Sequence, residues 1–174
     1  MNHRVCKVFE LTEFEKEKVN EIINLAFATD LSQDRLSFGT ELLVSLVSVD
    51  GVIVGTALAD EMHENTMEPL SNHFLHIYSL GVHPDHRGKG YCSYIVDAFV
   101  QKYGKERSMY LNVNTSKENH NSKAIHCYQK NGFRLVDCLY KHQDGDPHSY
   151  MVRIKGKPKK PKKHRKKTKR RKNK

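Results

Sequence analysis

The sequence predicts a single mixed α/β domain built around one sheet. Its first 154 residues alternate strand-like segments with segments whose apolar residues recur at helical spacing. Two strand-like segments are joined by a two-residue turn, which is typical of a hairpin within a sheet. About 150 residues also suit one ordinary domain with its own core.

The domain is predicted to open with a strand and a helix. Residues 5–11 have the β-branched character of a strand. Thr12 stands at the N-cap position of the following helix, and Glu15, three residues later, completes a capping box. The apolar face of this helix comprises Val19, Ile22, Ile23, Ala26 and Phe27.

Three strands are predicted next. Residues 42–49 and 52–59 are expected to pair around Asp50-Gly51, a dipeptide that favours a type I′ turn. A polar stretch separates this hairpin from the third strand, at residues 74–82.

The remaining elements are predicted in the order helix, strand, helix, strand, strand. They are expected at residues 92–103, 109–113, 121–130, 133–140 and 149–154. Gly104 ends the first of these helices. The complete order, β α β β β α β α β β, is typical of a mixed domain around one sheet.

The net charge is unevenly distributed along the chain. The formal charge is +10, but residues 155–174 contain 14 Lys or Arg and no acidic residue, which leaves a net charge of −4 on residues 1–154. A segment so rich in charge and so poor in apolar residues is predicted to be disordered. We therefore expect an acidic domain at residues 1–154 and a polybasic tail at residues 155–174.

The tail supports more than one interpretation. Its run at residues 159–167, KKPKKHRKK, resembles a nuclear or nucleolar localisation signal, which an import receptor would bind. The same charge suits nucleic acid or another acidic surface, and the simplest alternative is a solubilising extension.

The expected location is intracellular, in the nucleus or nucleolus of a eukaryotic host and otherwise in the cytoplasm. No apolar run reaches the roughly 18 residues that span a bilayer, and the N-terminus lacks the apolar stretch of a signal peptide. Cys6, Cys92, Cys127 and Cys138 have no CxxC spacing, so we expect reduced, structural cysteines. The 11 histidines form no HExxH or zinc-finger pattern, and no metal site is expected.

The loop between the third strand and the next helix is a candidate anion site. Gly88 and Gly90 permit close backbone approach, and the N–H groups and dipole at a helix start favour negative charge. Arg87 and Lys89 add positive charge. The loop fits neither a Walker A motif nor a dinucleotide-binding fingerprint.

This loop resembles the acetyl-CoA loop of the GNAT superfamily of N-acetyltransferases. The signature there is Arg or Gln, two residues, Gly, one residue, and then Gly or Ala; Arg87, Gly90 and Cys92 occupy these places, with Cys92 replacing the usual small residue. A second motif of the superfamily has an Asn at a helix start, a Tyr two turns later and Gly-Phe opening the next strand. Its counterparts here are Asn121, Tyr128, Gly132 and Phe133. The resemblance covers approximately residues 5–154.

The resemblance implies an α+β fold with one mixed, mostly antiparallel central sheet and helices on both faces. The strands at residues 74–82 and 109–113 would splay apart to form the acetyl-CoA cleft, where the main chain near Leu80 and Val82 would hold the pantetheine arm. An amine would attack the thioester of acetyl-CoA directly, in a ternary complex. The residues implied to cradle the pyrophosphate are Arg87, Gly88, Lys89, Gly90, Tyr91 and Cys92.

The resemblance also implies catalytic roles. Tyr128 occupies the position that protonates the leaving thiolate in relatives, and a phenol is protonated at neutral pH; the alternative is that its ring only packs in the core. Many relatives have a Glu base where this chain has His76, and a histidine can accept a proton near neutral pH. A packing role for His76 is the alternative. Asn121 would hold the cofactor or serve only as an N-cap.

The acceptor is expected to be a primary amine: a small amine, a polyamine, a lysine side chain or a protein N-terminus. The acidic domain favours a cationic acceptor. The alternative function is a catalytically idle domain of this fold that binds nucleic acid or ribosomes through the tail.

Overall fold

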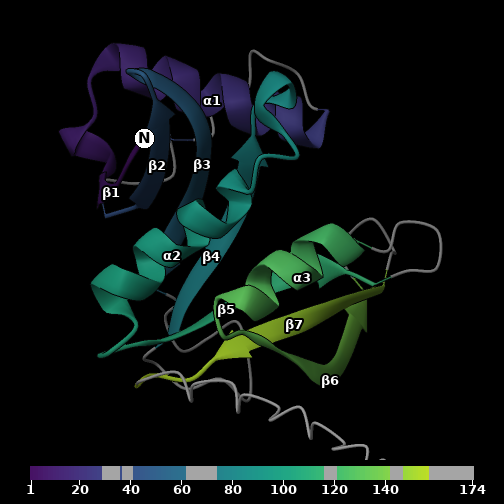
Figure 1. Ribbon diagram of the computed structural model, residues 1–174. Helices are drawn as coiled ribbons and strands as arrows, with labels where there is room; N and C mark the ends of the chain where they lie inside the picture. The colour runs from purple at the N-terminus through teal and green to yellow at the C-terminus, as the bar shows by residue number, and fades with distance from the viewer. Residues whose placement is uncertain (29–35, 37–40, 62–73, 116–120, 142–146, 157–174) are drawn as a thin grey trace, which may run out of the picture.

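The computed structural model describes residues 1–28, 36, 41–61, 74–115, 121–141 and 147–156. The helices and strands follow the predicted order (Figure 1). They are β1 (Asn2–Lys7), α1 (Glu13–Phe27), β2 (Leu43–Val49), β3 (Val52–Glu61), β4 (Phe74–Val82), α2 (Tyr91–Tyr103), β5 (Ser108–Asn114), α3 (Ser122–Lys130), β6 (Arg134–Lys141) and β7 (Pro147–Arg153). Two short 3₁₀ turns, Val8–Glu10 and Pro84–His86, lie between them.

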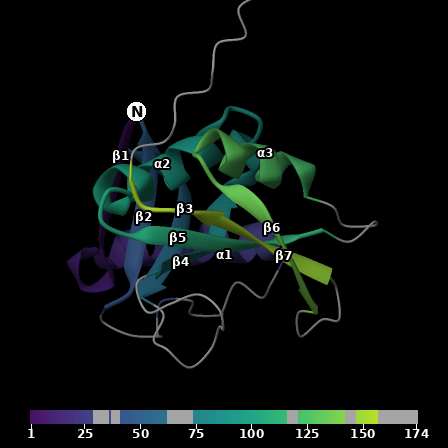
Figure 2. The same ribbon diagram turned by 90° about the horizontal axis from the view of Figure 1, so that it is seen from below.

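The described strands form one mixed sheet in the order β1-β2-β3-β4-β5-β7-β6. Among these strand pairs β4–β5 is parallel and the others are antiparallel. Helices α2 and α3 cover one face of the sheet, and α1 covers the other (Figures 1 and 2). The predicted fold class, a mostly antiparallel central sheet with helices on both faces, is confirmed.

The predicted first strand is partly wrong. β1 ends at Lys7, and Val8–Glu10 turn as a 3₁₀ helix. The Glu10 carboxylate accepts a hydrogen bond from the Lys7 backbone N–H at 2.6 Å, and this local bond favours a turn over a continued strand. Val8 and Leu11 are both buried, so the turn still places its apolar side chains in the core.

Two local predictions are confirmed. Thr12 and Glu15 form a reciprocal capping box at the start of α1: the Thr12 hydroxyl accepts from the Glu15 N–H, and the Glu15 carboxylate accepts from the Thr12 N–H. The β2–β3 hairpin turns through Asp50 and Gly51, which both have positive φ (51° and 82°), as a type I′ turn requires.

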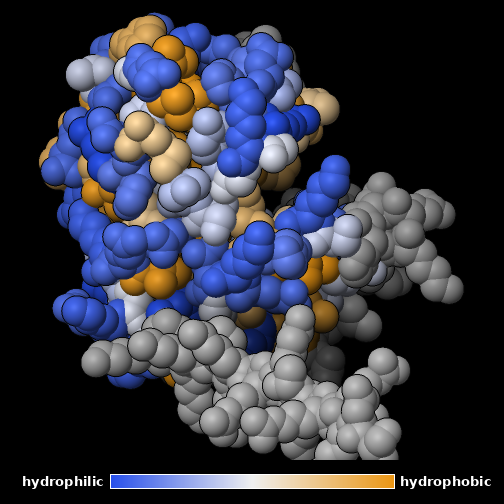
Figure 3. All heavy atoms as spheres, viewed as in Figure 1, coloured by the Kyte–Doolittle hydropathy of each residue, from blue (hydrophilic) through white to orange (hydrophobic). Residues whose placement is uncertain are grey.

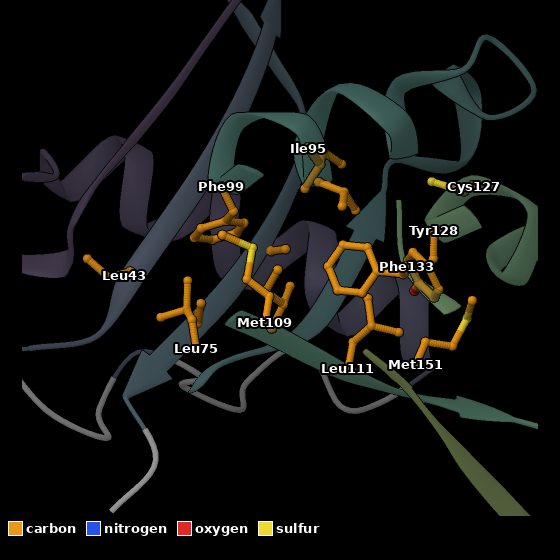
Figure 4. Close-up of a cluster of buried hydrophobic side chains, with 14 of the residues drawn as sticks. Leu43, Leu75, Ile95, Phe99, Met109, Leu111, Cys127, Tyr128, Phe133 and Met151 are labelled. Carbon is orange, nitrogen blue, oxygen red and sulfur yellow. The ribbon is translucent and has the colours of Figure 1, made fainter. Parts of the chain in front are cut away.

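The core consists of two apolar layers, one on each face of the sheet. The larger layer joins α2 and α3 to the sheet; Phe99 of α2 and Met109 of β5 are fully buried in it (Figure 4). The smaller layer packs Val19 and Ile23 of α1 against side chains of β2 and β3. The two layers fix the position of the helices that flank the candidate site.

The expectation that the cysteines are all reduced is wrong for one pair. Cys92 of α2 and Cys127 of α3 form a disulfide, with their Cα atoms 6.4 Å apart. The pair is 35 residues apart in sequence and was not predictable from spacing, because helix packing brings the two together. Cys6 is buried and free, and the side chain of Cys138 lies outside the described part.

Most of the predicted tail, residues 157–174, lies outside the described residues. The proposed boundary at residue 154 and the disorder of the tail therefore stay predictions. Within the described part, no helix has the length and apolar character needed to cross a bilayer.

Candidate active site

β4 and β5 pair only at their first residues and then diverge. The parallel register joins Phe74 to Ser108, Leu75 to Met109 and His76 to Tyr110, and ends there. Beyond these pairs the strands enclose a cavity of about 430 Å³. Its lining includes Ile77, Tyr78, Ser79, Leu80, Leu111, Asn112, Val113, Asn114, Asn121 and Tyr128, with Ala26 and Phe27 of α1. We call this cavity the β4–β5 cleft; it lies where splayed strands were predicted.

A β-bulge in β4 lies in the wall of this cleft. Thr56 pairs with Gly81 and Leu58 pairs with Tyr78, so Ser79 and Leu80 together lie opposite Ala57 alone. Ser79 has a φ of 48°, which is unusual for a residue other than glycine. A bulge interrupts the strand ladder locally, and both bulge residues, Ser79 and Leu80, line the cleft. The sequence contains no signal for this bulge.

α1 approaches β4 closely at the same place. A Cβ on Gly81 would lie 2.9 Å from the Cβ of Ala26 and 3.1 Å from the backbone oxygen of Ile22, so a side chain there would push the helix away. This contact holds the end of α1 against β4 and places Ala26 and Phe27 in the cleft wall.

The loop after β4 presents an uncapped helix start. Gly90 is the N-cap residue of α2 and has a φ of 84°; Gly88 has a φ of 78°. No side chain caps α2, and a Cβ on either glycine would meet no atom within 4 Å. The glycines are therefore required by backbone conformation, and the space beside them is open. First-turn N–H groups in such a position favour an anion.

The two basic side chains of the loop, Arg87 and Lys89, each donate a hydrogen bond to a different backbone carbonyl. The Arg87 Nε donates to the Val82 carbonyl at 3.1 Å, which ties the loop back to the end of β4. The Lys89 ammonium donates to the Asp85 carbonyl at 3.4 Å. Both side chains are exposed, and Tyr91 and Cys92 occupy the first two positions of α2. Figure 3 shows the surface indented between the start of α2 and α3.

Tyr128 lies in the inner wall of the cleft. Its ring packs beside Phe133, with the ring centroids 6.4 Å apart, and lies near Leu111 and Met151 (Figure 4). The residue is only 8% exposed, and burial raises the pKa of its phenol to about 12. Both expected roles are therefore compatible with its position: the ring is part of the core, and the residue also lines the cleft.

Asn121 caps α3 and also lines the cleft. Its side-chain oxygen accepts a hydrogen bond from the Ala124 N–H at 3.1 Å, and its backbone N–H donates to the Asn114 carbonyl at 3.2 Å. The predicted N-cap is confirmed. These bonds connect the start of α3 to the end of β5 on one side of the cleft.

His76 lies on the opposite face of the sheet from Tyr128, at the end of the cleft where β4 and β5 still pair. It forms a row with Asp60 of β3 and Tyr110 of β5. The His76 ring stacks on Tyr110 and on Tyr78, with centroid distances of 4.5 and 5.0 Å. The His76 Nδ1 lies 3.7 Å from the Asp60 Oδ1, and Tyr78, which lines the cleft, hydrogen-bonds to Asp60.

The buried environment of this row keeps the His76 side chain uncharged. Burial lowers the pKa of His76 to about 4, so the imidazole is neutral near pH 7. Burial raises the pKa of Asp60, while its hydrogen bond from Tyr78 opposes that shift. Within the described part of the chain, the His76 Nε2 is buried and has no hydrogen-bond partner.

The structure thus divides the predicted site residues into three groups. Leu80, Asn121 and Tyr128 line the β4–β5 cleft, and Val82 leads from the same end of β4 into the loop. Residues 87–92 form the loop and the first turn of α2. His76 does not line the cleft and contacts it through Tyr78.

Sequence reasoning missed Asp60 and Tyr110, because cross-strand register places them beside His76 and no motif marks them. It also missed the bulge at Ser79. Among the described residues, no three His, Cys, Asp or Glu side chains are grouped as a metal site.

Comparison with known proteins agrees with this geometry. Residues 8–133 match the Acetyltransferase (GNAT) family. No curated protein sequence matches the chain. Several solved structures share the fold at low sequence identity, which is evidence for the fold alone.

One is an acetyltransferase from Corynebacterium glutamicum related to a histone acetyltransferase (18% identity, TM-score 0.67, covering 91% of this chain and 99% of that one). A second is the ribosomal-protein-S18-alanine N-acetyltransferase from Escherichia coli (15% identity, TM-score 0.64, covering 92% of this chain and 99% of that one). A third is an aminoglycoside acetyltransferase in complex with coenzyme A and kanamycin (19% identity, TM-score 0.65, covering 88% of this chain and 95% of that one). Because the family match spans most of the chain and the fold agrees, the chain belongs to the acetyltransferase (GNAT) family, the N-acetyltransferases that its two motifs predict.

Proposed function

We propose that this N-acetyltransferase transfers an acetyl group from acetyl-CoA to a primary amine by direct attack in a ternary complex. The observation that carries the proposal is the β4–β5 cleft: it has Tyr128 in its wall and the bulged main chain of β4 along it. The end of β4 then continues into an uncapped helix start. One extended ligand with an anionic end and a thioester end fits this order of groups.

The start of α2 suits the pyrophosphate of acetyl-CoA. The first-turn N–H groups of α2, including those of Tyr91 and Cys92, have no side-chain cap, and the helix dipole adds a partial positive charge. Gly88 and Gly90 leave room for phosphate oxygens to approach the main chain. Arg87 and Lys89 supply charge from the rim of the loop.

The cleft suits the pantetheine arm, which carries amides and needs main-chain partners. The bulge at Ser79 and Leu80 interrupts the pairing of β4 with β3, so its main-chain groups are available to the arm and to the thioester carbonyl. Main-chain N–H groups near Leu80 and Val82 would stabilise the negative charge that develops on the carbonyl oxygen during attack.

Tyr128 is the proposed acid. The neutral amine nitrogen bonds to the thioester carbon, the C–S bond breaks, and the departing thiolate takes a proton from the phenol. The nitrogen loses one proton as the amide forms, and this proton restores the phenol, so that the products are the amide and the free thiol of CoA. Because burial raises the pKa of Tyr128 to about 12, the phenol is fully protonated at neutral pH and available to donate.

His76 is the proposed base, directly or through a water molecule. Its pKa of about 4 leaves the imidazole neutral near pH 7, in the form that accepts a proton, and the same burial makes it a weak base. Asp60 lies on the Nδ1 side of the ring, which favours a proton on Nδ1 and leaves Nε2 as the acceptor. The Tyr78 hydroxyl connects Asp60 to the cleft.

The acceptor belongs to the class of cationic primary amines: small amines, polyamines, lysine side chains or protein N-termini. The Tyr78 ring in the cleft wall and the partly exposed Asp60 carboxylate would attract a cation near the proposed base. The similar folds include a protein N-acetyltransferase and an aminoglycoside acetyltransferase, so the fold itself does not select among these amines.

A thiol-release assay with a panel of amines and peptides tests the proposal. We expect acetyl-CoA to give free CoA at a rate that depends on the amine, and millimolar acetyl-CoA to raise the melting temperature. A protein that gives no amine-dependent release and no thermal shift with acetyl-CoA would contradict the proposal.

A further inference from the structure

The disulfide between Cys92 and Cys127 joins the two helices that flank the proposed acetyl-CoA site. Cys92 is the second residue of α2, in the turn whose N–H groups face the proposed pyrophosphate position. Cys127 immediately precedes Tyr128 on α3. The bond therefore links the anion-binding turn directly to the helix that holds the proposed acid.

The disulfide is only one of the contacts between α2 and α3. The Asn131 side-chain amide donates to the Ser93 hydroxyl at 3.1 Å and to the Cys127 carbonyl at 3.0 Å. Apolar side chains of both helices also share the larger core layer. These contacts would hold the helices together without the disulfide, so we expect the reduced protein to fold. We expect the disulfide to adjust the geometry of the site.

The separation of the two sulfur atoms changes with their redox state. Two sulfur atoms joined by a bond lie about 2 Å apart. Two free thiols cannot come so close, because their sulfur atoms stay at least a van der Waals contact apart. After reduction the sulfur atoms separate by side-chain rotation or by movement of the helices, and the first turn of α2 is no longer covalently tied to the middle of α3. Cys92 is partly exposed and Cys127 is 8% exposed, so an external thiol has access from the Cys92 side.

We propose that Cys92 and Cys127 form a thiol–disulfide exchange site that controls acetyl-CoA affinity, with the disulfide form binding more tightly. The inference rests on the proposed function of the cleft. The reagent is a small disulfide such as glutathione disulfide. A Cys thiolate attacks it, releases one glutathione thiolate and forms a mixed disulfide; the second Cys thiolate then displaces the other. The protein loses two electrons and two protons, and two glutathione molecules are formed.

The disulfide form binds more tightly because the cradle is fixed before the ligand arrives. In the reduced form, acetyl-CoA must also restrain the first turn of α2 relative to Tyr128, and this ordering weakens binding. We expect the dissociation constant of acetyl-CoA to be about fivefold higher for the reduced protein. Linkage requires the reciprocal effect: saturating acetyl-CoA favours the disulfide by the same factor.

The test uses the full chain, equilibrated either with glutathione disulfide or with a phosphine reductant that carries no thiol. Peptide mapping by mass spectrometry determines whether Cys92 and Cys127 are linked, and calorimetry measures the affinity for a thioether analogue of acetyl-CoA. We expect the Cys92–Cys127 peptide in the oxidised sample only, a melting temperature about 10 °C lower after reduction, and the fivefold loss of affinity.

Three variants separate the site from general effects of the reagents. Cys92→Ala and Cys127→Ala each remove the bond, and their affinities should not respond to the redox state. Cys6→Ala, a change at a buried cysteine outside the pair, should retain the full response.

The outcomes separate this inference from the proposed function. A mapping experiment that finds Cys92 and Cys127 unlinked under glutathione disulfide overturns the exchange site. Equal affinity in the two states, or tighter binding by the reduced protein, overturns the control of affinity while leaving the proposed function intact. No binding of the analogue in either state overturns both.

Discussion

The proposed active site has two sides next to the β4–β5 cleft, one at the start of α2 and one at the His76 row, and they are built from different kinds of chemical group. On the α2 side, the proposed ligand contacts are backbone N–H groups from one continuous stretch, residues 87–92. On the His76 side, the groups are side chains that three strands bring together: Asp60, His76 and Tyr110. The first side is proposed to bind the pyrophosphate, which every acyl-CoA shares. We expect the second side to determine which amine reacts.

The same difference explains what the sequence could predict. A loop with glycines at fixed spacing and a helix behind it is a local pattern, so the cradle, α2 and α3 were predicted within one or two residues. The His76 row depends on strand register, which joins residues 16 and 34 positions apart in the chain. No local pattern specifies such a row, and Asp60 and Tyr110 were therefore missed.

The disulfide and the bulge were missed for related physical reasons. Cys92 and Cys127 meet because α2 and α3 pack side by side, and the bulge at Ser79 depends on the register in which β4 pairs with β3. By contrast, the capping box and the type I′ turn are set by neighbouring residues, and both were predicted correctly.

The largest expected effect is a loss of kcat when the proposed acid, Tyr128, is changed. In Tyr128→Phe, kcat should fall about 100-fold or more, while KM for acetyl-CoA should change less than about threefold, because the hydroxyl is proposed to act only on the departing thiolate. Steady-state kinetics measures both constants. Phe133→Leu is a matched control for disturbance of the same core layer. A Tyr128→Phe enzyme with the parent kcat would show that the ring only packs.

The second prediction concerns the pH dependence of stability on the His76 side. Burial lowers the pKa of His76 from 6.5 to about 4, so between these values the unfolded chain binds a proton that the folded protein does not. Stability should therefore fall as the pH falls from 7 to 4.5, and His76 should contribute about 2 kcal/mol of that loss.

Urea unfolding at the two pH values tests this contribution. His76→Gln should show a smaller loss than the parent protein, whereas His3→Gln, at an exposed position, should show the parent loss. If His76→Gln retains the parent pH dependence, the described burial of His76 is wrong.

The third prediction separates backbone strain from cofactor binding on the α2 side. Gly90 and Gly51 have nearly equal φ values, 84° and 82°, and neither has an atom within 4 Å of an added Cβ. Changing either to Ala should reduce stability by about 1–2 kcal/mol. Only Gly90→Ala should also raise KM for acetyl-CoA, by about tenfold. An equal rise in both variants would remove Gly90 from the proposed cradle.

The smallest expected effect is that of the basic tail on turnover. We propose that residues 155–174 serve as a localisation signal or attach the enzyme to an acidic partner, and that they take no part in the chemistry. Removing residues 157–174 should leave kcat/KM for small amines within about twofold, while salt-sensitive binding to an acidic polymer such as RNA or heparin should be lost. A truncated protein that loses turnover of small amines would show that the tail contributes to the active domain.

The central claim is that acetyl-CoA lies along β4 with its pyrophosphate at the start of α2. An acetyl-CoA titration followed by backbone amide shifts in two-dimensional NMR tests it most directly. The account predicts that the largest shifts occur in two segments, residues 79–82 and 88–93. Saturable binding whose largest shifts fall elsewhere, for example on β1 and the start of α1, would contradict it.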